Sequence, residues 1–337
     1  MKIFMTGASG FIGKRIVNLL LSKGHELVCL VHETSIDNPK VTSVKGDIRK
    51  KNSMKTMKGC DAVIANAAIY EFGPVKSVKN IMYDVNVTGT KNTLDLALEY
   101  GIPKIVYVSS IVVFGDTEFT DCATESDIPK NSDPWPRPCH SLYAETKREA
   151  HIYAQKLIEE KNAPITIALP SVVYGEDDHS AVGAFLEDLV QGDLIGKMGT
   201  KIKCNFNYVD DVAEGIVLCL EKGKNENYII GGSRENNVNP MKPLELAADI
   251  GGYPMPSRTL PMGMVKFVEK IYRIKGALTR KHQLINKESI DSMIYNNIVS
   301  NEKAVKELGY SARPLDEGIK RTIEWYGEHY GDNVNRK

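Results

Sequence analysis

Tyr143 and Lys147 lie four positions apart in the segment Tyr-Ala-Glu-Thr-Lys, a spacing suited to acid–base chemistry. Side chains at i and i+4 share one face of a helix, so the lysine charge can favour the phenolate. A tyrosine that ordinarily titrates near pH ~10 could then exchange a proton at neutral pH. The same spacing recurs at Tyr100 and Lys104, but an intervening glycine and proline break that turn. We therefore expect only the first pair to share a helix face.

The pair follows a long alternation of predicted strands and helices. Residues 2–6 are predicted as a buried strand, 14–22 as an amphipathic helix and 26–31 as a second strand. Strand, helix and strand within about 30 residues form a βαβ unit, which predicts a parallel sheet. Up to residue 170 the alternation continues with strands at 41–44, 62–65, 104–109 and 165–169 and helices at 53–57, 82–100 and around Tyr143.

After Pro170 the chain changes to segments rich in Gly, Asp, Asn and Pro between separate helices. We expect an α/β fold: a Rossmann-type doubly wound parallel sheet in an NAD(P)-binding domain of residues 1–170, with sheet elements returning near 206–232. A smaller, interleaved substrate-binding domain takes most of 171–330, and 331–337 form a tail. Its predicted elements are helices near 182–190, 244–250, 263–274, 301–307 and 315–326, a strand and helix at 206–220 and a strand at 228–230.

The composition is that of a globular chain with no excess charge. Of 337 residues, 42% are hydrophobic and 26% charged, and 43 Lys and Arg balance 43 Asp and Glu. A net charge of zero predicts neither nucleic acid nor an anionic membrane as a partner, and no apolar run is long enough to predict a membrane span. The six cysteines form no Cys-X-X-Cys pair and no signal-peptide pattern is present. We expect free thiols, no metal site and a cytoplasmic location.

Gly7, Gly10 and Gly13 lie where the first strand gives way to the first helix. Glycine permits a tight turn and a close approach of the backbone to a pyrophosphate, and the helix N-terminus supplies free N–H groups. The spacing is G-x-x-G-x-x-G rather than the G-x-G-x-x-G of typical dinucleotide dehydrogenases. The turn predicts a dinucleotide cofactor.

The end of the second strand bears on which dinucleotide is bound. NAD-preferring sites usually carry an acid here, but this strand ends at Val31 and His32 follows. Lys14 and Arg15 lie just past the glycine turn, where they are either ligands of a 2′-phosphate or part of a solvated helix face. Glu33 favours NAD. We predict NADP, with NAD as the alternative.

Eight sequence blocks occur together in the order typical of one enzyme family. On these blocks the chain resembles the extended short-chain dehydrogenase/reductase family. Within it, the resemblance is strongest to the dihydroflavonol-reductase-like group, which includes bacterial members called hopanoid-associated sugar epimerases. Residues 300–310 also fit that group. The blocks are residues 6–13, 46–48, 66–68, 86–90, 108–110, 143–147, 169–175 and 208–213.

The resemblance implies catalytic roles by position. Tyr143 is the general acid/base, and Lys147 lowers its pKa and holds the nicotinamide ribose. Ser110 polarises the substrate carbonyl, although a plain strand-end serine is the alternative. Asn86 takes the supporting asparagine position or is only a helix cap. The residues implied to contact the cofactor are Gly7, Ser9, Gly10, Phe11, Ile12, Gly13, His32, Asp47, Ile48, Ala67, Ala68, Tyr143, Lys147, Pro170 and Ser171.

Within that set Asp47 and Ile48 are expected to flank the adenine, although Asp47 could instead be a turn residue. Asp210 and Asp211 are expected to be structural and to cap the next helix. Nucleotide-sugar epimerases usually carry a phosphate-binding arginine where this chain has Cys204. Nucleotide-sugar dehydratases add an Asp-Glu pair after the serine, where this chain has no acid. Both departures favour a simple carbonyl or alcohol substrate.

The sequence therefore predicts NADPH-dependent reduction of a ketone or aldehyde, with Tyr143 protonating the alkoxide. An NAD-dependent nucleotide-sugar epimerase/dehydratase is the alternative, because the same residues can remove and return a hydride. A non-catalytic dinucleotide sensor would be expected to lose Tyr143 or Lys147, and this chain keeps both. Proteins of the family often form homodimers through a helix pair beside the active site.

Overall fold

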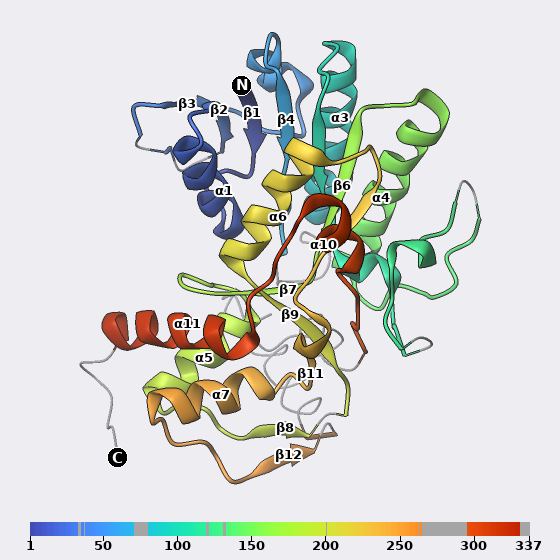
Figure 1. The fold of residues 1–337 in the computed structure, drawn as a ribbon. Helices are drawn as coiled ribbons and strands as arrows, with labels where there is room; N and C mark the ends of the chain where they lie inside the picture. Colours follow the sequence, from blue (N-terminus) through green and yellow to red (C-terminus); the bar gives the residue numbers. More distant parts are fainter. Residues whose placement is uncertain are drawn as a thin grey trace.

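A computed structural model describes residues 1–32, 35–36, 38–70, 80–118, 121–130, 133–199, 201–261, 263–264 and 295–330 (Figure 1). Its centre is a seven-stranded sheet of order β10-β6-β5-β4-β1-β2-β3, in which every neighbouring pair is parallel. The predicted α/β architecture with a parallel sheet is confirmed. The strands are β1 (Lys2–Thr6), β2 (Glu26–Val31), β3 (Val41–Lys45), β4 (Ala62–Ala65), β5 (Ile105–Val108), β6 (Ile165–Pro170) and β10 (Asn227–Ile230).

Helices cover both faces of this sheet. Along β1, Ile3 and Met5 pack in a core with α1 (Phe11–Ser22) and α6 (Val209–Lys222). Phe4 points the other way, into a core with α3 (Thr90–Glu99), α4 (Leu142–Lys161) and the 3₁₀ turn η1 (Lys51–Met57). This alternation follows from the two-residue period of a strand, and burial on both faces explains why the middle of β1, residues 3–5, is apolar throughout.

The strand order reverses between β1 and β4, which are neighbours at the centre of the sheet. The crossovers run outward from β1 to β3 on one side and from β4 to β10 on the other. In such sheets the crevice beyond the carboxyl ends of the strands, at this switch point, is where ligands bind. Gly7 follows β1 and Asn66 follows β4, so both lie at this crevice.

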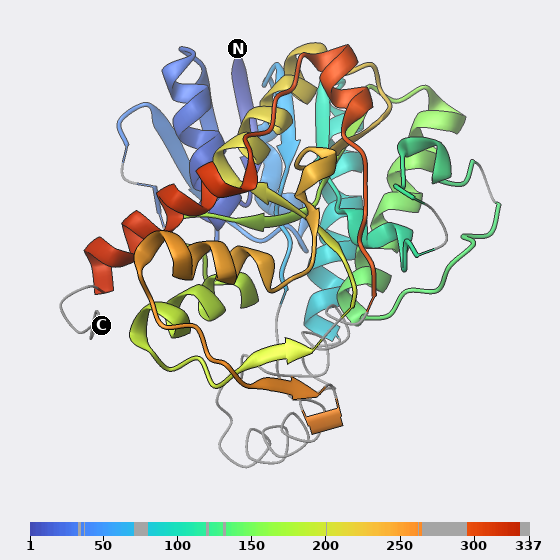
Figure 2. The same cartoon turned by 60° about the horizontal axis from the view of Figure 1, so that its bottom comes forward.

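A second layer lies beyond the carboxyl ends of the strands (Figures 1 and 2). Its helices enclose a separate core around Phe206, Leu186, Leu244 and Ile319. Within the described ranges no helix combines the length and apolar content needed to cross a membrane. The elements are β7 (Val172–Tyr174), α5 (Ala181–Gln191), β8 (Lys197–Gly199), β9 (Cys204–Tyr208), β11 (Asn237–Val238), α7 (Lys242–Gly251), β12 (Thr259–Pro261) and α11 (Leu315–Tyr330), while α10 (Glu302–Leu308) returns to α6 and β10.

Three predicted elements differ in detail. The strand expected near 206 does not return to the first sheet: β9 pairs with β7 and β11, and only α6 and β10 return. The helix expected over 82–100 contains a π turn, η2 (Asp84–Gly89), before α3. A Cβ at Gly89 would lie 2.4 Å from Ile48 Cδ1, so the wide turn sits where the chain passes closest to Ile48. Most of the helix predicted at 263–274 is outside the described residues.

Candidate active site

The glycine turn after β1 is packed so closely that side chains would not fit. Gly7 has φ +69°, and a Cβ there would lie 2.8 Å from the backbone of Ala67. A Cβ on Gly13 would lie 2.0 Å from the carbonyl oxygen of Gly7. The hydroxyl of Thr6 accepts hydrogen bonds from the amides of Asn66 and Ala67, both at 3.1 Å. The turns that follow β1 and β4 are thereby joined.

The N-terminus of α1 points its free N–H groups out of this turn. Gly10 is the N-cap, no side chain caps the helix, and its first turn contains no acidic residue. These N–H groups and the positive end of the helix dipole fit a pyrophosphate. Ser171, after β6, adds a buried hydroxyl for which the described part of the chain supplies no hydrogen-bond partner. Both features fit a dinucleotide.

The predicted catalytic residues are brought together at the end of β5. Ser141 caps α4 through Ala144 N at 3.0 Å, which places Tyr143 and Lys147 in the first two turns. Ser110, the second residue after β5, caps the short helix η3 (Ile111–Phe114) and makes a hydrogen bond with the Tyr143 hydroxyl. The two hydroxyls and the lysine therefore lie on one wall of the crevice.

The protonation of this pair differs from the sequence prediction. Burial raises the pKa of Tyr143 to about 12, and the Ser110 hydrogen bond opposes this only in part. Burial also lowers the pKa of Lys147 to about 7. Lys147 is 2% exposed, its Nζ donates to Val108 O at 2.8 Å, and it lies 5.1 Å from the centre of the Tyr107 ring. In the protein alone, desolvation outweighs any attraction between the two groups, and Tyr143 holds its proton at neutral pH.

Asn86 is buried in the π turn and caps no helix. Its Oδ1 accepts from Ile69 N at 2.8 Å, and its Nδ2 donates to Ile69 O at 3.0 Å and to Thr146 Oγ1 at 3.1 Å. It thus fastens the segment after β4 to α4, one residue before Lys147. The amide side chain satisfies both backbone groups of Ile69, which a carboxylate could not do.

The remaining predicted cofactor residues all follow carboxyl ends of strands in the seven-stranded sheet, which places them along one edge. Ile48 is 8% exposed and packs on Gly89. Asp47 lies in a turn, where Arg49 binds its carboxylate at 2.7 Å and lowers its pKa. The positions are Gly7, Ser9, Gly10, Phe11, Ile12 and Gly13 after β1, His32 after β2, Asp47 and Ile48 after β3, Ala67 and Ala68 after β4, and Pro170 and Ser171 at the end of β6.

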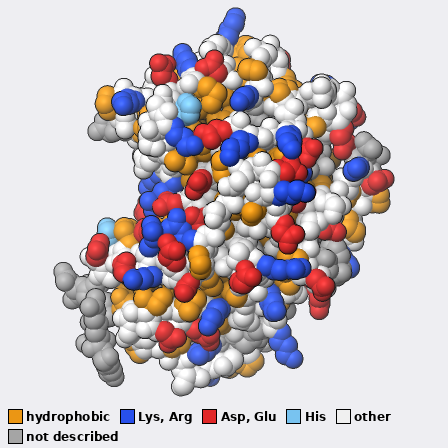
Figure 3. Space-filling view, viewed as in Figure 1, with side chains coloured by type: hydrophobic (Ala, Val, Ile, Leu, Met, Phe, Trp, Pro, Cys, Tyr) orange, Lys and Arg blue, Asp and Glu red, His pale blue; other side chains and the backbone are white. Residues whose placement is uncertain are grey.

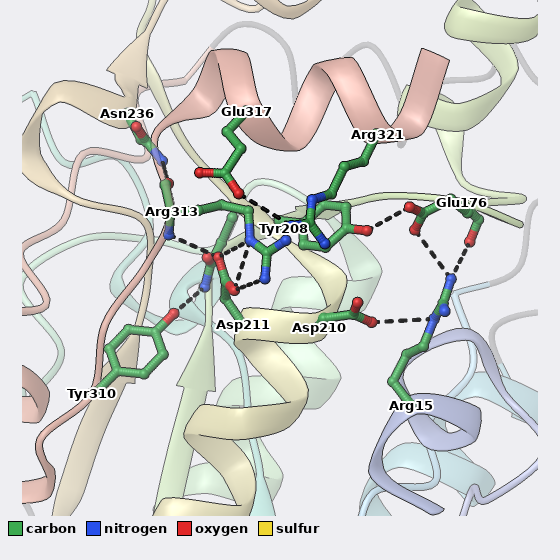
Figure 4. Close-up of polar contacts among 11 residues, drawn as sticks. Arg15, Glu176, Tyr208, Asp210, Asp211, Asn236, Tyr310, Arg313, Glu317 and Arg321 are labelled. Carbon is green, nitrogen blue, oxygen red and sulfur yellow. Dashed lines mark hydrogen bonds and ion pairs between the residues drawn. The ribbon is translucent and has the colours of Figure 1, made fainter. Parts of the chain in front are cut away.

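Lys14 and Arg15 are not free cations. Lys14 pairs with Asp177 at 2.8 Å. Arg15 pairs with Glu176 at 3.1 Å and with Asp210 at 3.5 Å, as Figure 4 shows. Figure 3 shows basic and acidic side chains interspersed over this face of the molecule. The two basic residues therefore no longer support a 2′-phosphate site. The remaining sequence argument for NADP is the absence of an acid at Val31 and His32.

The same network accounts for Asp211. Its carboxylate is 3% exposed and forms a two-pronged ion pair with Arg313, with contacts from 2.7 to 3.0 Å (Figure 4). It also accepts from the backbone N–H of Arg313 at 2.8 Å. Asp211 is structural as expected, but it holds the segment before α11 and does not cap α6, which has no side-chain cap. Residues this distant in sequence gave no signal of their pairing.

Cys204 is buried, with 4% of its surface exposed, and burial raises the pKa of its thiol to about 12. It lies in β9, where it bridges to Asn297. Next to it, Asn205 is fully buried and bonds to the backbone of Gly232 and Ser233. No cation occupies the position expected for a phosphate-binding arginine.

Three residues around the catalytic pair were not among the predicted site residues. The ring of Tyr70 meets that of Tyr143 edge to face, with centroids 4.7 Å apart. Ser109 and His151 form a buried hydrogen bond, Oγ to Nδ1, at 3.0 Å. His151 lies four residues after Lys147 on the same helix face, and this continued i, i+4 spacing was the available signal.

Known proteins resemble this chain in sequence and in fold. A family model described as "NAD dependent epimerase/dehydratase family" matches residues 3–231. A putative dihydroflavonol 4-reductase of Synechocystis sp. is 25% identical over 97% of this chain and 94% of its own length. A 3-beta-hydroxysteroid dehydrogenase of Mycolicibacterium neoaurum is 26% identical over 99% and 93%. The crystal structure of gox2253 aligns with a TM-score of 0.76 at 27% identity, covering 99% of this chain and 98% of that one.

Proposed function

The chain belongs to the NAD-dependent epimerase/dehydratase family of extended short-chain dehydrogenases/reductases, and we propose that it is an NADPH-dependent reductase of a ketone or aldehyde. The supporting observation is the grouping of Tyr143, Ser110 and Lys147 at the end of β5, beside a glycine turn that fits a dinucleotide. In this proposal the half built on the seven-stranded sheet binds the cofactor. Most of residues 171–330 bind the substrate.

Each residue of the site has a separate role in the proposed reaction. The bound nicotinamide supplies the hydride that the carbonyl carbon receives. Ser110 and Tyr143 hold the carbonyl oxygen with their hydroxyls, and Tyr143 gives its proton to that oxygen as negative charge develops. The raised pKa of Tyr143 keeps this proton available at neutral pH. Lys147 stabilises the phenolate that remains, and Asn86 keeps the segment after β4 against α4.

The preference for NADP is supported by the end of β2. Val31 provides no carboxylate for a ribose hydroxyl, and its partner in β3 is the exposed Lys45. Asp47, the acid in the turn after β3, is already paired with Arg49. We propose that a 2′-phosphate would meet His32 and Lys45.

A nucleotide-sugar epimerase or dehydratase using NAD is the second candidate, because the family name includes both reactions. The buried Cys204 argues against this second candidate, since a sugar diphosphate needs a cation at that position.

The six free cysteines agree with a cytoplasmic location.

We also propose a homodimer formed through the outer face of α4 and the helical residues 80–83 that lead into η2. Three large apolar side chains are exposed there, Ile81, Tyr83 and Ile152, at 40, 41 and 39%, and grouped exposed apolar side chains are typical of protein–protein contacts. Light scattering of the purified protein measures the mass directly, and a monomeric mass rejects the dimer.

Purified protein titrated with NADPH and with NADH, followed by a panel of carbonyl compounds and UDP-sugars, tests the proposed activity. We expect tighter binding of NADPH and its oxidation by a ketone or aldehyde. Interconversion of a UDP-sugar without net NADPH oxidation rejects the reductase in favour of the epimerase.

A further inference from the structure

The helix α4 touches the end of β5 at three successive turns. Lys147 Nζ donates to Val108 O at 2.8 Å, and Tyr143 shares a hydrogen bond with Ser110. Between Val108 and Ser110 stands Ser109, whose hydroxyl meets Nδ1 of His151 at 3.0 Å. Three consecutive strand-end residues thus contact the i, i+4 and i+8 positions of one helix face. The first two contacts involve the predicted catalytic groups, and the third has no role in the reaction described above.

The Ser109–His151 contact is sealed from water. Ser109 is 3% exposed and His151 0%. The Trp135 ring lies edge-on to His151, with centroids 5.7 Å apart, and the Arg148 guanidinium lies 4.7 Å from the centre of that ring. Burial and then the nearby Lys147 charge lower the pKa of His151 to about 3. The imidazole is therefore neutral at working pH, and the contact is a hydrogen bond between neutral groups in an apolar setting.

Near the active site, small side chains supply the buried apolar packing of α4. Its buried apolar residues there are Ala144, Ala150 and Ala154, with Leu157 only at the far end. Alanine has no rotatable side chain to interlock with its neighbours, whereas a hydrogen bond fixes both distance and direction. The strand-end contacts therefore add a directional constraint on where the helix stands relative to β5, beside the bonds of Thr146 to Asn86 and of Arg148 to Val113 O.

We propose that Ser109 and His151 form a positioning pair that holds the end of β5 and α4 together, so that Ser110 and Lys147 stay in register with Tyr143. Neither residue touches substrate. Ser109 is joined through the backbone to both Val108 and Ser110, so a shift of its hydroxyl moves both of their contacts. This proposal rests on the proposed function in one respect only: the rate measurements need a substrate that the enzyme reduces.

His151→Leu and Ser109→Ala each remove the hydrogen bond from one side, and leucine keeps much of the bulk of the ring. We expect each variant to lower kcat about tenfold or more, because small misplacements of reacting groups are costly. The KM for NADPH should stay within about twofold, since the glycine turn is untouched. The double variant should be no slower than the worse single variant, because both remove the same bond.

His151→Gln supplies the rescue, because its amide can still bond to Ser109 and is neutral. We expect its kcat to return to within about threefold of the wild type. Tyr153→Phe is the matched control: it removes a hydroxyl of the same helix that bonds to Asp95 of α3 rather than to the end of β5. The control should lower Tm while leaving kcat unchanged.

Hydrogen exchange of peptides covering residues 105–114, measured with NADPH present, tests the pair without turnover. Exchange should rise in His151→Leu and Ser109→Ala and stay unchanged in Tyr153→Phe. If no carbonyl compound is reduced by the wild type, the proposed function fails and this measurement still decides the pair. The pair is rejected if His151→Leu loses only Tm, as the control does, if the two single effects on kcat add, or if exchange at 105–114 does not change.

Discussion

Two regions of this molecule bury charged side chains, and they differ in whether the buried charge has an oppositely charged partner. On α4, Lys147 is 2% exposed and meets a backbone carbonyl, with no carboxylate among the described residues within ion-pair distance. At the junction between α1, α6 and the segment before α11, Asp211 is 3% exposed and is matched by Arg313 (Figure 4). An unmatched buried charge titrates easily, whereas a matched one holds two segments together. The buried Lys147 is therefore suited to proton transfer, and the Asp211–Arg313 pair is suited to holding two segments of the chain together.

The largest effect should follow from removing the acid on the catalytic face. Tyr143→Phe deletes the hydroxyl and keeps the ring that packs on Tyr70. We expect kcat to fall about 10²–10⁴-fold, because the alkoxide loses its proton donor. NADPH affinity, measured by fluorescence, should change little. Full turnover in this variant would remove Tyr143 from the mechanism whatever the substrate is.

At the junction, Arg313→Met should cost the most stability. It keeps the apolar stem but leaves the Asp211 carboxylate buried without its partner, which we expect to cost about 3 kcal/mol in urea unfolding. Asp211→Asn combined with Arg313→Met should recover part of this loss, because no unpaired charge remains. A single variant as stable as the wild type would show that this pair does not hold the segment before α11.

The buried imidazole on α4 should make stability depend on pH. The folded pKa of His151 is about 3, below its ordinary value, so only the unfolded chain takes up this proton as pH falls below about 6.5. Its contribution is complete above that pH and is lost toward pH 3. We expect the wild type to lose stability relative to His151→Gln by up to about 1.4 kcal/mol per pH unit between pH 6 and 4. Comparing the two proteins cancels the carboxylates common to both. Parallel pH curves would place a charged imidazole in the folded protein.

The smallest effects concern the exposed ion pairs of α1. Arg15→Met should lower the free energy of unfolding by about 1 kcal/mol, because Arg15 meets Glu176, Asp210 and the Glu176 carbonyl. Lys23→Met is the control, since Lys23 has one ion-pair partner among the described residues, Glu221, and is 38% exposed; this variant should cost less than about 0.5 kcal/mol. Salt at about 0.5 M should shrink both effects. Equal losses in the two variants would mean that the junction is no stronger than an ordinary surface pair.

Local signals carried most of the fold prediction. Strand and helix periods in the first half placed nearly every element of the seven-stranded sheet, because most strands there, though not β3, are apolar runs next to a turn. The glycine turn was equally readable, since its spacing reflects a steric demand that Gly7 and Gly13 meet in the structure. The sequence pattern did not predict the π turn at Asp84–Gly89, because this turn lies where the chain passes Ile48, which is distant in sequence.

By itself, the sequence determined the parallel sheet, the glycine turn and the presence of Tyr143, Lys147 and Ser110, because each depends on residues close together in the chain. Only the tertiary structure decided how these groups are charged and what surrounds them. It raises the pKa of Tyr143 by burial, pairs Lys14 and Arg15 with acids more than 150 residues away, and sets His151 against Ser109. Burial and ion pairing depend on contacts between distant segments, and no local pattern encodes them.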